Sequence, residues 1–433
     1  MKQSSPLRRL STGVLAERDF RLFFIGYTTS IVGAAMVPVA LTFAVLDTGR
    51  GIADVGYVLT AETVPLVVLL LVGGVVADRF PRGSVMIAAD VLRCVSEATL
   101  AVLVLAESPP LWVFMALAAV IGAGQAFFNP ALTGLVPLIA SPARLQQANA
   151  LRSAATSAGQ IIGPASAGLL VAAGGAGWAI AVDAATYAVS ALCLLRLRIP
   201  PRDRTTAVSF LKQLRTGWVE FRGRKWLWVI VLQFGLFHLF VFAPFMVLGA
   251  VISQDSLGGP SSWGIILSSQ GIGSIAGGLI ALRIRPCRPL MIAVASTLGF
   301  AAPVALLALG ASTAWIALSA LGSGAGLALF GTLWDTTLQQ QVPSQVLSRV
   351  SAYDWLGSVA LIPLGYALAG PVAEAVGPRT VLLLAAIWTV ASGVGVLAVP
   401  EVRRLAAVVP VVPVVPVAAS EVVTIDPMPA SGA

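Results

Sequence analysis

The chain has 433 residues, of which 58% are hydrophobic and only 11% are charged, and its mean hydropathy is +0.91. A soluble domain carries about 25% charged residues, so this composition excludes a water-soluble globular protein. The net charge of +8 comes from arginines placed between apolar blocks. That placement argues against nucleic acid as a partner and indicates contact with membrane lipids.

The apolar residues form windows of about 20 residues, the length that a membrane-spanning helix needs. We predict the first six helices near 22–46, 55–76, 84–106, 111–138, 149–174 and 177–197. We predict the second six near 226–252, 262–282, 289–310, 313–341, 347–372 and 379–399. Pro137 and Pro343 are expected to end or kink a helix. The fold class is therefore an all-α membrane protein with 12 transmembrane helices.

These windows divide the chain into two halves. The expected parts are a cytoplasmic N-terminus (1–21), an N-terminal six-helix half (22–197), a cytoplasmic linker (198–225), a C-terminal six-helix half (226–399) and a disordered cytoplasmic tail (400–433). Within the linker, the stretch 210–221 is predicted to form an amphipathic helix on the membrane surface. The tail is too rich in proline to span a membrane.

Charge predicts the orientation. If the N-terminus is inside, the outside loops hold only Arg50 and Arg379, and the other loop arginines lie inside. The positive-inside rule then places both termini in the cytoplasm. Lysine is rare against arginine and the content of alanine, glycine and valine is high, which indicates a high-GC bacterial genome, so we expect the chain in a bacterial inner membrane. The basic N-terminus is too long and polar for a cleaved signal peptide. Cys94, Cys193 and Cys287 are far apart, so neither a metal site nor a disulfide framework is expected.

The two halves repeat each other at an offset of roughly 205 residues. The segment Leu71–Arg79 aligns with Ile275–Arg283, and Leu132–Pro137 aligns with Leu338–Pro343. Two similar halves with a site between them are typical of a transporter, because the halves can rock and expose the site alternately to each side.

A loop between the second and third helices carries Gly74, Asp78, Arg79 and Arg82. It resembles the signature loop of the major facilitator superfamily, a glycine followed by Asp-Arg and further basic residues. Gly73 and Gly74 would allow close helix packing, and Asp78 would pair with basic groups or a helix N-terminus of the other half. We interpret these residues as a conformational latch. The second half has Leu282 in place of the acid.

The fifth helix contains Gly159, Gly163, Pro164 and Gly168. This spacing resembles the exporter motif of the same superfamily, G-x-x-x-G-P with a further glycine, which implies proton-linked export. Generic helix packing is the alternative, because small residues at this spacing let any two helices approach.

Further stretches, Phe127–Pro130, Arg144–Leu151, Leu338–Pro343 and Arg349–Gly357, resemble the branch that contains enterobactin and macrolide exporters. The resemblance runs from about Leu15 to Leu397 and implies the major facilitator fold. One departure is that the fourth helix lacks the basic residue that many proton antiporters of the family carry.

Ionisable residues inside a membrane are costly and indicate function. Asp90, Arg93 and Glu97 share one face of the third helix, where a neutralised structural cluster and a proton relay are both possible. Glu62 and Asp183 have no evident local partner. The unperturbed pKa of a histidine suits proton sensing, and a satisfied polar group among aromatic residues is the equal alternative for His238. The candidates for proton coupling are Glu62, Asp90, Arg93, Glu97, Asp183 and His238.

In the family, helices one, four, seven and ten line the substrate cavity. The resemblance therefore implies, as cavity residues, Thr28, Met36, Gln125, Phe128, Asn129, Phe237, His238, Trp334 and Asp335. Aromatic side chains with few fixed charges suit a bulky amphipathic substrate.

The sequence contains no nucleophile elbow, metal-ligand cluster or Walker motif, so we expect neither an enzyme nor a cofactor. The prediction is a monomeric secondary transporter that exports a small lipophilic molecule (a drug, macrolide or siderophore-like compound) by alternating access, driven by the proton gradient. The alternatives are a secondary importer, a narrow-specificity metabolite transporter, and a membrane scaffold or sensor without transport.

Overall fold

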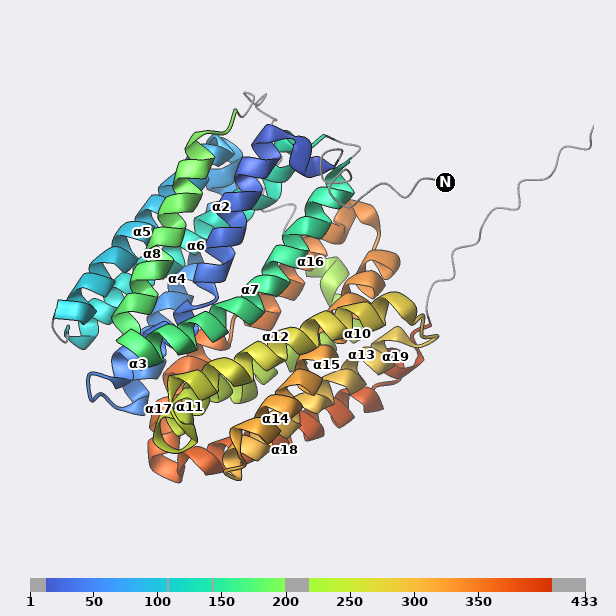
Figure 1. Cartoon of the computed structure of the whole chain (residues 1–433). Coiled ribbons are helices and arrows are strands. Elements are labelled where there is room, and N and C mark those ends of the chain that lie inside the picture. Colours follow the sequence, from blue (N-terminus) through green and yellow to red (C-terminus); the bar gives the residue numbers. More distant parts are fainter. Residues whose placement is uncertain (1–12, 107–108, 142–143, 199–217, 407–433) are drawn as a thin grey trace, which may run out of the picture.

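The computed structural model of the chain describes residues 13–106, 109–141, 144–198 and 218–406 (Figure 1). This part is almost entirely helical and contains no β-strand. Most of the predicted surface helix 210–221, and the tail from 407 on, lie outside the described residues. Pro400–Arg404, expected to belong to the disordered tail, form the short helix α19 instead.

The helices follow the predicted windows closely. The first half comprises η1 (Val14–Ala16), α2 (Arg18–Ala34), α3 (Val37–Leu46), α4 (Ile52–Arg79), α5 (Arg82–Ala106), α6 (Leu111–Ile139), α7 (Leu145–Gly174) and α8 (Ala176–Leu195). The second half comprises α10 (Lys225–Phe237), η3 (His238–Phe242), α11 (Ala243–Ile252), η4 (Ser253–Leu257), α12 (Pro260–Arg283), α13 (Pro289–Thr297), η5 (Leu298–Phe300), α14 (Ala301–Ala308), α15 (Thr313–Gln341), α16 (Ser344–Val359), α17 (Ile362–Val376) and α18 (Pro378–Ala398).

Ten helical segments in the described part are long and apolar enough to cross a membrane. Two further helices have spanning length but are less apolar: α5, with 25 residues and four charges, and α7, with 30 residues and a polar first half. The twelve predicted windows are thus all helical, and the prediction of an all-α, multi-pass membrane protein is confirmed.

Four of the predicted spans are interrupted. The first span breaks between α2 and α3 at Ala35–Met36, and Pro38 follows at the start of α3. The eleventh breaks between α16 and α17, where Pro363 follows. Proline lacks the N–H group that continues a helical ladder, which explains both breaks. The seventh span contains the π-helical turn η3, and the ninth the 3-10 turn η5.

The two halves pack in the same way. Helix α4 lies against α6 in the first half, as α12 lies against α15 in the second. Both pairs approach at backbone distance, because a Cβ added to Gly73 would lie 2.2 Å from the Ala126 carbonyl oxygen, and one added to Gly277 would lie 2.1 Å from that of Ala325. This shared packing supports the internal repeat found in the sequence.

The helix bundle has two ends. We call the end where α2 begins the Arg18 end, and the opposite end, with the α3–α4 turn, the Gly51 end. In Figure 1 the helices of the two halves come together around α3, α11 and α17, at the Gly51 end, and diverge toward the Arg18 end.

Contacts between the halves run mainly through α4 with α17 and through α7 with α12. On the first pair, a Cβ at Gly56 would lie 2.2 Å from the Tyr366 carbonyl oxygen, and Thr60 donates a hydrogen bond to the Pro363 carbonyl at 3.1 Å. On the second, Ser268 donates to the Ile161 carbonyl at 2.8 Å. Nearer the Gly51 end, a Cβ at Gly370 of α17 would lie 2.2 Å from the Ala53 Cα of α4, and one at Gly168 of α7 would lie 2.7 Å from the Pro260 carbonyl oxygen of α12, so the halves are joined there.

We predict that Gly56→Ala loosens this joint. The added methyl group would clash with the backbone of α17, and overpacking of this kind costs about 1–3 kcal/mol. Thr60→Cys, in a chain whose native Cys94, Cys193 and Cys287 are replaced, should then react faster with a membrane-impermeant maleimide. Gly322→Ala is the control, because a Cβ there meets nothing within 4 Å. Equal labelling rates in the two variants would contradict the prediction.

Candidate functional site

The first half contains a buried cluster of ionisable side chains. Asp90, Arg93 and Glu97 project from one face of α5, and Asp183 projects toward them from α8. Their exposed fractions are 0%, 4%, 1% and 1%. The sequence placed three of these residues on one helical face, but only the packing of α5 on α8 adds Asp183 to them.

Arg93 is the cation of the cluster. Its Nη2 donates to Oδ1 of Asp90, so the pair is i, i+3 on α5. The guanidinium also lies between two rings, 4.5 Å from the Phe128 centroid on α6 and 4.2 Å from the Tyr187 centroid on α8. Cation–π contacts are strongest where water is excluded. Arg93 therefore holds α5, α6 and α8 together.

Glu97 and Asp183 form a second pair, without a cation between them. Both side chains line the same small cavity, and their carboxyl groups are close enough to interact. Asp183 Oδ1 accepts a hydrogen bond of 2.9 Å from Thr186, but its Oδ2 and both oxygens of Glu97 have no N–H or hydroxyl donor among the described residues. Two carboxylates have only acceptors, so their contact requires a proton on one of them.

Glu62 lies at the edge of this cluster and is partly exposed. Its charge acts on Asp183 within the first half and on Tyr366, which belongs to α17 of the second half. The backbone at Glu62 is pressed against α6, because a Cβ at Gly122 would lie 1.8 Å from its carbonyl oxygen. Glu62 thus stands between the buried cluster and the joint of the two halves.

The remaining proton-coupling candidate, His238, is in the other half. It begins η3, and its Nδ1 lies 2.9 Å from the Phe234 carbonyl oxygen. Its ring contacts Phe234, Phe237 and Phe242. The structure therefore brings five of the six candidates together and leaves His238 in an aromatic environment.

The candidate cavity residues lie in different surroundings. Gln125 and Asn129 on α6 are partly exposed, and Asp335 on α15 is exposed. Phe128 faces Arg93 inside the first half, and Phe237 packs on Phe300 inside the second. Trp334 is buried and donates from Nε1 to Oδ2 of Asp354 at 3.0 Å. Thr28 and Met36 line a groove of about 680 Å³ between α2, α7 and α8.

The glycines of the exporter motif pack on two sides, against the end of α2 and against α12 of the second half. Gly159 and Gly163 face α2, where added Cβ atoms would lie 3.1 Å from the Ile31 carbonyl oxygen and 2.5 Å from the Ala35 Cβ. Gly168 faces the other half, where a Cβ would lie 2.7 Å from the Pro260 carbonyl oxygen on α12. The motif thus packs α7 against α2 on one side and against the second half on the other.

In the latch loop, Arg82 donates to the Gly134 carbonyl on α6. Arg79 is exposed at the end of α4, and the side chain of Asp78 lies outside what the structure describes. The expectation that Gly74 allows close packing is wrong in this conformation, because a Cβ there meets nothing within 4 Å. Its neighbour Gly73 provides the close approach to α6.

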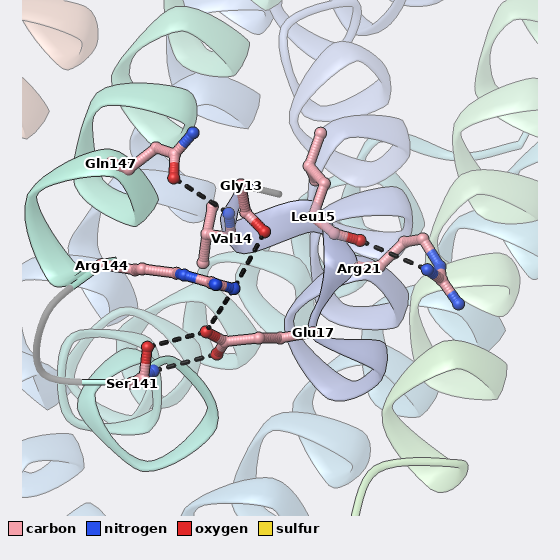
Figure 2. A network of polar contacts seen from close by, with 8 residues as sticks. All are labelled: Gly13, Val14, Leu15, Glu17, Arg21, Ser141, Arg144 and Gln147. Atoms are coloured by element: carbon pink, nitrogen blue, oxygen red, sulfur yellow. Dashed lines mark hydrogen bonds and ion pairs between the residues drawn. The ribbon is translucent and has the colours of Figure 1, made fainter. Parts of the chain in front are cut away.

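A polar network at the Arg18 end was not predicted (Figure 2). Glu17 accepts hydrogen bonds from the Ser141 N–H at 2.9 Å and hydroxyl at 2.7 Å, and pairs with Arg144 at 3.2 Å. Arg144 also donates to the Gly13 carbonyl, and the Val14 N–H donates to Gln147. These contacts tie the segment before α2 to the connection between α6 and α7.

Sequence reasoning missed Glu17 because its partners are more than 120 residues away. A signal was present in part, since Arg144 and Gln147 belong to the stretch that resembles the exporter branch. The Glu17 side chain is 24% exposed, and the network acts as a structural tie of the first half.

The sequence matches the family described as Major Facilitator Superfamily over residues 23–358. That match covers most of the chain and agrees with the repeated all-helical fold. The chain belongs to the major facilitator superfamily, a class of membrane transporters for small molecules.

Its relatives include named exporters. The chain is 23% identical over 265 residues to macrolide efflux protein A of Streptococcus pyogenes. The match covers 60% of this chain and 65% of that relative, which is less than two thirds of its length. It is 26% identical to the multidrug efflux pump Tap of Mycolicibacterium fortuitum, over 89% of this chain and 96% of Tap. It is 27% identical to the enterobactin exporter EntS of Shigella boydii, over 82% and 87% of the two chains.

Solved structures agree on the fold. The chain resembles the nucleoside transporter NupG with a TM-score of 0.67 at 15% identity, over 88% of this chain and 98% of that one. The family match and the three exporter relatives confirm the predicted resemblance to the macrolide- and enterobactin-exporter branch of the superfamily.

We predict that Glu17→Gln loosens the network at the Arg18 end. Burial opposes ionisation of Glu17, but hydrogen bonds from Ser141 and the charge of Arg144 outweigh it and lower the pKa below the ordinary value of 4.5. The ionised form therefore stabilises the fold above that value, and the contribution is lost as pH falls through the lowered pKa. At pH 7 the substitution should reduce the opening free energy of η1 by about 1 kcal/mol.

Amide hydrogen exchange at Val14–Ala16 measures this effect. Protection in Glu17→Gln should be several-fold weaker than in the wild type at neutral pH, and the two should converge in acid. Asp19→Asn is the control, because Asp19 pairs with its exposed neighbour Arg18 and not with the described residues of the network. Equal protection in Glu17→Gln and the wild type at pH 7 would show that the network contributes nothing.

Proposed function

We propose that the chain is a secondary active exporter that moves a small lipophilic molecule outward by alternating access, in exchange for protons. The observation that carries the proposal is the joint between the halves. They are held together at the Gly51 end by backbone contacts of α4 with α17 and of α7 with α12, which is the arrangement of one of two alternating states.

The charge asymmetry of the loops supports a cytoplasmic Arg18 end. In that orientation the contacts at the Gly51 end close the protein toward the outside. The names of the relatives, a macrolide efflux protein, a multidrug efflux pump and an enterobactin exporter, support the outward direction and a bulky, lipophilic substrate. The excess of acids over cations in the buried cluster supports protons as the coupling ion.

The experiment is an accumulation assay in cells with and without the protein. A panel of dyes, macrolides and siderophores is tested before and after the proton gradient is collapsed. Lower accumulation of at least one compound, reversed by the collapse, is the expected result. Uptake instead of efflux would replace the exporter with an importer, and efflux that survives the collapse would exclude protons as the driving ion.

We further propose that Asp78 acts in the latch when the Arg18 end closes, by pairing with basic groups or a helix N-terminus of the second half. An interaction of this kind is worth about 1 kcal/mol, a roughly fivefold shift in population. Asp78→Asn should therefore reduce efflux several-fold at unchanged membrane insertion. Asp54→Asn, which removes a charge from the other end of α4, is the matched control. Wild-type efflux by a well-inserted Asp78→Asn protein would remove the latch.

A further inference from the structure

The buried cluster of the first half holds more acids than the cation beside it can neutralise. Arg93 is committed to Asp90, which also accepts a hydrogen bond from Ser190. Glu97, Asp183 and the nearby Glu62 have no further cation among the described residues around them. Full ionisation would leave several uncompensated negative charges inside the membrane, which is energetically prohibitive. At least one proton must therefore be held here.

The contact between Glu97 and Asp183 is where that proton is held. Carboxyl groups this close cannot both ionise, and they share a proton instead. Both side chains also line a cavity of about 10 Å³, together with apolar residues of α3, α6 and α8. That is close to the smallest volume that admits a water molecule. The pair therefore has a place for one water to deliver or remove the proton.

Asp183 also touches the break in the first span. A Cβ added to Gly33 would lie 2.0 Å from Oδ1 of Asp183 and 2.2 Å from Oγ1 of Thr186. Gly33 is one residue before the end of α2, and α3 begins at Val37. Val37, Ala40 and Leu41 of α3 form one wall of the water-sized cavity. The carboxyl pair is thus packed against both sides of the break.

The same break touches the exporter motif. Ala35 lies against Gly163 of α7, and the next glycine of the motif, Gly168, packs on α12 of the second half. On α12, a Cβ at Gly264 would lie 2.5 Å from the Pro164 carbonyl oxygen. A continuous series of close contacts therefore runs from Asp183 through the α2–α3 break and α7 to the joint between the halves.

We propose that the Glu97–Asp183 pair is the proton-exchange site of this transporter and that its protonation sets the geometry of the α2–α3 break, and through it the joint of α7 with α12. This inference rests on the proposed proton-coupled export and names the site and the route of coupling. It singles out the carboxyl pair from the other ionisable candidates.

The step is a simple proton transfer. The shared O–H bond of the pair breaks, a bond forms to the water in the cavity, and the water leaves as hydronium or passes the proton on. Two carboxylates then face each other and repel, so Asp183 moves against Gly33. The groups that face the pair are Asp90, Arg93 and Cys94 of α5, Tyr187 of α8 and Glu62 of α4. Arg93 stays paired with Asp90 and limits the repulsion.

The experiment uses substrate-free, purified full-length protein, so that it does not depend on the substrate. Spin labels on exposed Ser84 and Leu282, one in each half, report the distance between the halves as the pH is changed. Infrared spectroscopy reports the protonated carboxyl group in the same samples. Glu97→Gln and Asp183→Asn imitate the protonated side chains at nearly constant volume, and Asp255→Asn, on the exposed turn η4, is the matched control.

The expected result is a pH-dependent distance between the halves in the wild type and in Asp255→Asn. Glu97→Gln and Asp183→Asn should each lose this pH dependence, and each should also lose the infrared band of the protonated carboxyl group. Gly33→Ala should shift the distance at every pH, whereas Gly322→Ala, in open space, should not. A pH-dependent distance that persists in Glu97→Gln and Asp183→Asn would overturn the proposal, as would a wild-type distance that never changes with pH.

The outcome is separable from that of the proposed function. Gradient-driven efflux by the wild type together with gradient-driven efflux by both pair variants leaves the exporter intact and refutes the pair. If the pair titrates and changes the distance between the halves, but the chain exports no compound in a proton-driven manner, the proposal for the pair stands and proton-coupled export is refuted.

Discussion

Close approach of helix backbones is the constraint on which this architecture depends. Inside a lipid bilayer the lipid tails are as apolar as the helix side chains, so helices gain little by burying apolar side chains against each other. They associate instead by tight packing at small residues. Gly73 against α6 and Gly277 against α15 do this within the two halves, and Gly56 against α17 does it between them. The same device therefore builds each half and joins the two. A joint made of backbone contacts can separate without leaving charged side chains unpaired.

The two halves are alike in packing but not in chemistry. The buried cluster lies wholly in the first half, where Arg93 holds three helices together and leaves the pair of Glu97 and Asp183 without a cation. The second half places His238 among aromatic rings instead. This asymmetry explains why the repeat helps with the fold and not with the site: the pseudo-symmetry preserves helix positions, whereas a proton site needs only one copy.

The interrupted first span connects the buried cluster of the first half with the joint between the halves. It lies between α8, which carries Asp183, and α7, which carries the glycine motif and contacts the second half. A span without a break would transmit strain along its whole length, whereas a broken span can change its angle at one point. The motif that resembles an exporter signature thus has a physical role here: it keeps α7 in contact with the break on one side and with α12 on the other.

The sequence by itself determined the membrane location, the twelve helical windows, the repeat and the family. The length of an apolar window and the spacing of small residues can be read along a single helix, because they do not depend on how that helix is oriented against its neighbours. It also identified Asp90, Arg93 and Glu97 as one face of one helix. Only the tertiary structure decided that Arg93 pairs with Asp90, that Asp183 meets Glu97, and that Glu17 binds a loop more than 120 residues away. Those contacts depend on which helices become neighbours and on their rotation, and neither is written in the periodicity of a uniformly apolar helix.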